Sequence, residues 1–155
     1  MAKKIHNVSG ITVEKDGMRL ELGTDRLNRN LNNAQYELDS AIMKSMKPLM
    51  PMRDSNFIKR VIAENASRAG TGEVYAAVGP EGRYLYEGKT MVDEKTGSPW
   101  ARKDARKVLV SQYAGKTNAK PNLTYSRGQQ SHWFEKAKER DSSEWQRVVN
   151  EEMEK

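Results

Sequence analysis

Histidines, cysteines and paired acids are the residues that most often perform catalysis or hold metals, and this chain has few of them. Its 155 residues include no cysteine, which excludes disulfides and cysteine-based zinc or redox sites. The only two histidines, His6 and His132, are far apart in sequence, and neither has metal-ligand spacing to a pair of acids. No Ser/His/Asp set with a recognisable spacing is present for nucleophilic catalysis.

The glycine-rich segment AGTGEV, residues 69–74, is a poor phosphate-binding loop. It lacks the third glycine of that motif, and we expect a strand after it rather than a helix. Acidic residues are plentiful, but none forms a clear pair on an apolar background, as general acid/base catalysis requires. The sequence therefore predicts a protein that is not an enzyme, with no catalytic residues, no cofactor and no metal site.

The aromatic residues are more informative. Six tyrosines and three tryptophans outnumber two phenylalanines, and many of them fall in predicted loops or at helix edges. Tyr and Trp combine a large apolar area with a polar group and are enriched in interface hot spots. They also stack on nucleobases, and each one is about as often ordinary core filler. The candidate subunit-interface residues are Tyr36, Met43, Tyr84, Tyr86, Trp100 and Trp133.

The charge balance is basic, with a net charge of +6 and a pI near 9.5, which is compatible with nucleic-acid binding. The basic residues are spread along the chain and mixed with acids, and even the densest cluster, ARKDARK at 101–107, contains an aspartate. A solvated surface is therefore favoured over a dedicated phosphate track. The longest apolar run, at 74–78, is too short to cross a bilayer, and no apolar segment of a secretion signal follows the basic start.

Residues 11–22 predict a β-hairpin, because apolar residues alternate on both sides of Asp16-Gly17. Thr24 is then placed to cap a helix over 24–47, which ends at Pro48 and Pro51. A single helical face collects the apolar residues of this segment, namely Leu27, Leu31, Ala34, Leu38, Ala41 and Ile42.

Tyr36 and Met43 lie one heptad apart on the opposite face of this helix. They are either scattered surface residues, which are common, or the sign of a helix with the core on one side and a neighbour on the other.

The middle of the chain is harder to interpret. Residues 56–66 are ambiguous between a short helix and a strand, whereas the run at 74–78 and the alternating Tyr84 and Tyr86 favour strands, so 56–87 is predicted as the sheet region. Residues 88–128 form a polar, turn-rich arm around a helical piece near 100–113. A loop-rich segment of this length is usually functional or becomes ordered on binding.

The C-terminal segment, 131–153, is predicted to be helical. Phe134 and Trp145 fall on one apolar stripe, whereas Trp133 lies about 100° away at its edge. Asp141 falls near the middle of the stripe, and with Glu144 three residues on it resembles a capping box that starts a second short helix. We therefore expect a broken helix in which Trp145 and Phe134 are in the core and Trp133 is at its margin, available to a neighbouring subunit.

Together these elements predict one α+β domain over residues 1–155. Its expected architecture is a small antiparallel sheet packed against a long N-terminal helix and a C-terminal helix, with a long loop-rich insertion.

An ordered set of motifs resembles a known family. LNNAQYELDSAIMKSMKPLMP is followed by GRYLYEGKT, GSPW, NLTYS and HWFEKAKERDSSEW. In that order they resemble the minor capsid proteins of tailed phages related to the head–tail neck and tail-completion family, from about residue 24 to the end.

The resemblance implies a structural virion protein, made in the host cytoplasm, whose copies form a ring joining the head connector to the tail. Its implied partners are further copies in a six- or twelvefold homo-oligomeric ring, the adaptor or stopper proteins of the neck, and the tail tube or terminator. DNA passes through the lumen without sequence-specific binding, so most lysines and arginines are expected to face neighbouring proteins or solvent. The alternative is a stand-alone basic nucleic-acid-binding protein.

Overall fold

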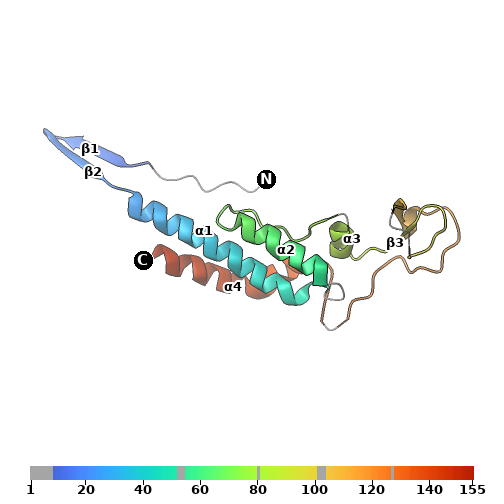
Figure 1. Cartoon of the computed structure of the whole chain (residues 1–155). Coiled ribbons are helices and arrows are strands. Elements are labelled where there is room, and N and C mark those ends of the chain that lie inside the picture. The colour runs from blue at the N-terminus through green and yellow to red at the C-terminus, as the bar shows by residue number, and fades with distance from the viewer. Residues whose placement is uncertain (1–8, 52–54, 80, 101–103, 127) are drawn as a thin grey trace.

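Two long antiparallel helices, α1 (Asp25–Met46) and α4 (Trp133–Met153), pack along each other and form the body of the molecule (Figure 1). The computed structural model describes residues 9–51, 55–79, 81–100, 104–126 and 128–155. The helix α2 (Ser55–Arg68) completes the body, and the short helix α3 (Gly82–Glu87) leads from it into the arm. The α+β class is confirmed, as is the packing of the N-terminal helix on the C-terminal helix.

The β-strands form two separate antiparallel hairpins rather than one sheet on the helices. β1 (Ile11–Lys15) pairs with β2 (Met18–Leu22), and β3 (Met91–Asp93) pairs with β4 (Lys107–Leu109). Figure 1 shows the two hairpins at opposite ends of the molecule, beyond the helical body. The molecule is therefore elongated, with a helical centre and a β-structured element at each end.

The predicted N-terminal hairpin is confirmed, with a two-residue turn at Asp16-Gly17. Both turn residues have positive φ, 52° and 77°, which is the type I′ geometry that matches the twist of paired strands. Lys15 is paired with Met18, so the register places the turn where the Asp-Gly pair predicts it.

Helix α1 also follows its prediction, with differences at both ends. The Thr24 hydroxyl accepts a bond of 3.4 Å from the Asn28 side chain instead of capping a backbone N–H. Helix α1 ends before Pro48, but the chain continues in a single 3-10 turn, η1 (Lys47–Leu49), that includes this proline. Leu27, predicted to be buried, is 39% exposed. The reason is that α4 reaches only as far as Asn30, whose side chain donates to the Met153 carbonyl.

The prediction of a sheet region at 56–87 is wrong. The described part of this segment contains α2 and α3 and no strand. Phe57, Ile58 and Val61 are buried at helical spacing on α2. Tyr84 and Tyr86 alternate in sequence but lie on α3, which ends at Gly88 with a φ of 71°.

The prediction of a helical piece near 100–113 is also wrong for the described residues. Strand β4 is followed there by a single 3-10 turn, η2 (Val110–Gln112). Residues 101–103 of that predicted piece lie outside the described residues.

The core lies where the end of α1, η1, α2 and the start of α4 meet, with Trp133 at its centre. The Trp133 side chain is fully buried, at 0% exposure, so its predicted place at the margin of the core is wrong. Its ring makes edge contacts with Phe57 and Tyr86, at centroid distances of 6.0 and 4.8 Å, and its Nε1 donates to the Ala76 carbonyl at 2.8 Å. Trp145 is buried as predicted, and the half-buried Phe134 stacks on it.

The predicted break at Asp141 is absent, because α4 is one continuous helix of 21 residues. Asp141 is tolerated within the apolar stripe because it is paired: Arg140 donates to both of its carboxylate oxygens, at 2.8 and 2.7 Å. The bonds from Arg140 and Ser45 lower the Asp141 pKa to about 2. Arg140 also donates to the Ser45 carbonyl, and Trp145 Nε1 donates to the Ser45 hydroxyl, which fixes α4 against α1.

Replacing Trp133 by alanine should destabilise the monomer by about 3–5 kcal/mol, because it removes a fully buried indole and leaves a cavity. Urea denaturation should show a loss at least as large as that of Trp145→Ala. Trp100→Ala, at an exposed position, should stay within about 0.5 kcal/mol of wild type. A loss for Trp133→Ala that is clearly smaller than for Trp145→Ala would contradict the central position of Trp133.

Asp141→Asn should lower stability at neutral pH and lose this effect in acid. Because folding lowers the Asp141 pKa from 3.8 to about 2, its stabilisation is present above pH 3.8 and disappears as the pH falls to about 2. Urea denaturation at several pH values should therefore give curves for wild type and Asp141→Asn that converge across this window. The exposed Glu139→Gln, with the same change of charge, serves as the control. A stability difference that is independent of pH would contradict this account.

Candidate functional site

The six predicted interface residues lie in four separate places. Tyr36 and Met43 share a groove on the body, whereas Tyr86 and Trp133 contact each other in the core. Tyr84 lines a second groove at the root of the arm, and Trp100 is exposed on an arm loop. The structure therefore forms no single site from them.

Tyr36 and Met43 face a neighbour within their own chain. Both line a groove of about 360 Å³ between α1 and α2, and Met43 packs against the core. The Tyr36 ring lies beside Gly70 and remains 52% exposed. Helix α2 therefore covers most of the second apolar face of α1, and the Tyr36 ring is the part of that face that remains exposed to a partner.

Asp39 is a buried acid beside this groove, and its carboxylate accepts hydrogen bonds from groups of the same chain. Its carboxylate accepts bonds from the backbone N–H groups of Gly70 and Gly72, at 2.8 and 3.1 Å, and from the Gln35 side chain at 2.7 Å. It therefore ties the turn after α2 to α1. The exposed charges that remain at the groove are those of Lys44 and Lys47.

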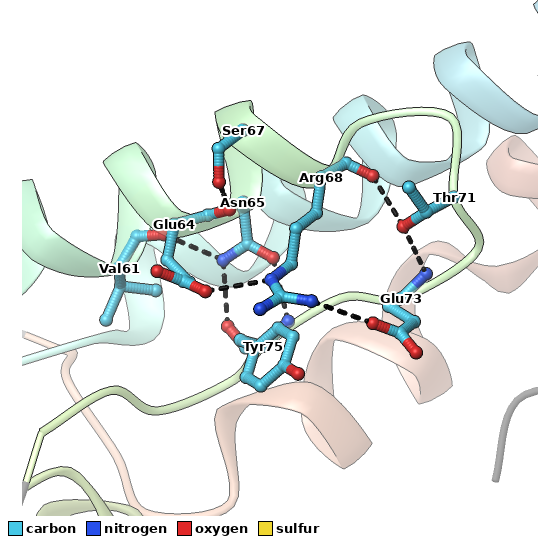
Figure 2. Close-up of polar contacts among 8 residues, drawn as sticks. All are labelled: Val61, Glu64, Asn65, Ser67, Arg68, Thr71, Glu73 and Tyr75. Atoms are coloured by element: carbon cyan, nitrogen blue, oxygen red, sulfur yellow. Dashed lines mark hydrogen bonds and ion pairs between the residues drawn. The ribbon is translucent and has the colours of Figure 1, made fainter.

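A polar clamp holds the segment after this turn on α2 (Figure 2). The buried Asn65 side chain donates to the carbonyls of Val61 and Tyr75 and accepts from the Tyr75 N–H, at 2.7–2.9 Å. Arg68 pairs with Glu64 and Glu73, and its guanidinium lies 4.7 Å from the centre of the Tyr75 ring. These bonds replace the strand pairing that residues 74–78 were predicted to have.

Tyr86 and Trp133 are structural residues in this chain. The Tyr86 hydroxyl donates to the Glu135 carboxylate at the start of α4, and burial together with that bond raises the pKa of Tyr86. The backbone N–H of His132 donates to the Tyr86 carbonyl at 2.8 Å. Both aromatic residues therefore fix α3 to α4, and Trp133 is not available to a second subunit.

Tyr84 lies in the arm-root groove, a cavity of about 910 Å³ between α3 and the β3–β4 hairpin. Its lining combines an apolar surface with cationic side chains, and consists of Gly79, Glu81, Arg83, Tyr84, Leu85, Lys89, Met91, Ala105, Lys107 and Leu123. The sequence indicated Tyr84 but not Met91 or Leu123, which reach the groove only because the arm folds back toward α3: Leu123 N–H donates to the Gly88 carbonyl at 2.8 Å.

His132, the histidine that the structure describes, belongs to no recognisable site. His6 lies outside the described residues, and the His132 ring is tilted against Tyr86 at a centroid distance of 5.4 Å. Within the described parts of the chain, no group of three or more His, Asp or Glu side chains is arranged to hold a metal ion. In the same parts, no helix has both the length and the apolarity to span a bilayer.

Comparison with known protein families, with curated proteins and with solved structures found no match.

Asn65→Ala should cost about 2–3 kcal/mol, since it removes three hydrogen bonds and leaves the polar backbone groups of Tyr75 without their partner. Urea denaturation measures this loss. The matched control is Ser67→Ala on the same helix, because the exposed Ser67 hydroxyl only bonds the Glu64 carbonyl, and it should change stability by less than about 0.5 kcal/mol. Equal effects of the two variants would show that the clamp does not hold the segment.

Proposed function

We propose that this chain is a structural protein of a tailed-phage virion, a tail-completion or terminator-like subunit of the neck ring that joins the head connector to the tail. The ordered motifs from residue 24 onward support this assignment. An assembly subunit needs no catalytic centre, but it does need surfaces beyond those that form its own core.

The N-terminal hairpin is the observation that carries the proposal. All of its described side chains, at residues 12–19, are exposed, including Met18 at 75% and Val13 at 48%. A two-stranded hairpin without further packing is marginally stable in water. The apolar residues of β1–β2 therefore favour a role in which the hairpin is completed by another molecule.

The position of the hairpin relative to the arm favours a ring. The two elements extend from opposite ends of the body (Figure 1) and differ in sequence and charge. Contacts between two different patches are heterologous, and such contacts close into rings when the rotation between subunits permits it. The hairpin and the root of the arm around Tyr84 are therefore the surfaces we assign to neighbouring subunits and neck proteins.

Mass spectrometry of purified virions should detect this chain at about six or twelve copies per particle, and electron cryomicroscopy of the neck should place it in a ring. Its absence from purified particles would overturn the proposal.

Met18→Glu should reduce incorporation into particles by about tenfold or more, because it places a charge on the apolar surface of the hairpin. The free energy of unfolding of the monomer should change by less than about 0.5 kcal/mol, since Met18 is outside the core. Quantitative mass spectrometry of particles made with each variant checks the first effect, and urea denaturation checks the second. The control is Ser142→Glu, which adds the same charge to an exposed position of α4; equal losses for both variants would remove the hairpin from the interface.

A further inference from the structure

The arm, residues 88–128, carries the entire net charge of the protein. It contains nine of the 27 Lys and Arg residues but only three of the 21 Asp and Glu residues, a net charge of +6. The rest of the chain has 18 basic and 18 acidic residues and is neutral. The excess of basic over acidic residues therefore belongs to the arm, whose described residues lie at one end of the molecule (Figure 1).

The acids of the arm do little to neutralise its surface. Asp93 is buried, and its carboxylate accepts bonds from the backbone N–H groups of Lys95 and Thr96, at 2.8 and 3.0 Å. Glu94 faces Arg106 at 3.7 Å, with the Arg106 side chain 80% exposed. Asp93 and Glu94 are thus engaged by groups of the arm itself, and Asp104 is the one remaining acid, exposed beside the densest run of basic residues.

In the described parts of the chain the ion pairs engage mainly arginines, and most lysines of the body, like those of the arm, form none. Arg68, Arg140 and Arg147 each form ion pairs with acids on the body. Among the described residues, the exposed side chains of Lys95, Lys107, Lys116 and Lys120 form no ion pair. The excess of basic over acidic side chains gives the arm a positive potential, which attracts an anionic partner.

Trp100 lies within this cationic region and is 83% exposed. The other two tryptophans are buried in the core, so Trp100 is the only one open to a ligand. Its backbone N–H donates to the Ser98 hydroxyl at 3.1 Å, which helps to fix the loop that carries it.

A cross-link within the arm brings this loop close to the lysines that follow η2. The Thr117 hydroxyl donates to the Gly97 carbonyl at 2.7 Å, and Thr117 lies between Lys116 and Lys120 in sequence. The Tyr113 ring fills the space beside Gly97 and Gly115, where a Cβ atom on either residue would come within 2.6 Å of it. Trp100, Lys95, Lys116 and Lys120 therefore belong to one folded unit.

We propose that the arm is a sequence-independent nucleic-acid-binding surface, in which its lysines contact phosphates and Trp100 stacks on an unpaired base. Cationic side chains that follow a backbone, combined with an exposed aromatic ring, are the two components by which proteins hold single strands without reading their sequence. This binding does not depend on the neck assignment, because it is a property of the isolated chain.

The test uses the full chain and a fluorescein-labelled single-stranded DNA of about 20 nucleotides. Anisotropy should show binding that weakens steeply with salt. Trp100→Ala should weaken it by about five- to hundredfold, as expected for one lost base stack. Because Trp133 and Trp145 are buried, unlabelled DNA should quench the tryptophan fluorescence of wild type but not that of Trp100→Ala.

Two double variants with equal changes of net charge distinguish binding by the arm from a general effect of the protein's charge. Lys116→Glu/Lys120→Glu should weaken binding by at least about fivefold and flatten the salt dependence by roughly 1.4 logarithmic units per decade, for two lost phosphate contacts. Lys59→Glu/Lys138→Glu, on exposed positions of α2 and α4, changes the net charge equally and should have a clearly smaller effect.

Three results would overturn the inference: no DNA binding at low salt, equal losses from the two double variants, or equally effective displacement of the DNA by polyglutamate. The last result would identify the arm as a surface for acidic proteins. DNA binding by a chain that is absent from virions would overturn the neck assignment alone.

Discussion

The burial of Trp133 is the constraint on which the rest of this small fold depends. Its indole contacts Phe57 of α2 and Tyr86 of α3, and its Nε1–H satisfies the Ala76 carbonyl in a segment without regular structure. One side chain at the start of α4 thus fixes three segments that precede it in the chain by about 50 to 75 residues. Since helix α3 leads directly into the arm, the same contacts also determine where the arm leaves the body.

The main apolar core is formed by the body of the molecule and not by its two ends. Among the side chains that the structure describes, neither the N-terminal hairpin nor the arm contributes to the main apolar cluster. Both elements are held by local contacts: the ladder of β1–β2 in the hairpin, and the Thr117–Gly97 bond and the fully buried Val92 in the arm. Such elements cost little to vary and expose most of their surface, which suits contacts with other molecules.

The local signals in the sequence predicted local structure well. Asp16-Gly17 specified a type I′ hairpin because both residues tolerate positive φ, and the 3.6-residue period gave α1 to within about one residue of each end. The errors arose where a distant partner decided the outcome. Residues 74–78 look like a strand in the sequence but have no regular structure, and Asn65 and Trp133 bind their backbone groups. Trp133 lies off the stripe that faces α1, yet it is buried because α2 and α3 cover its side of α4, and no periodicity within α4 reveals them.

The same distinction applies to the candidate sites. Tyr36 and Met43 were identified as a second apolar face, but only the fold shows that α2 of the same chain covers most of it. The charge of the arm, by contrast, is contained in the sequence, but the density of basic residues does not reveal it; only the balance of basic and acidic residues within each segment does. Outside the arm, basic and acidic residues are equal in number, and several of the arginines form ion pairs on the body. What distinguishes the arm is the scarcity of acids: it has three for nine basic residues, and Asp93 and Glu94 are engaged by the arm itself, so the surface that carries Trp100 keeps an excess of positive charge for an anionic partner.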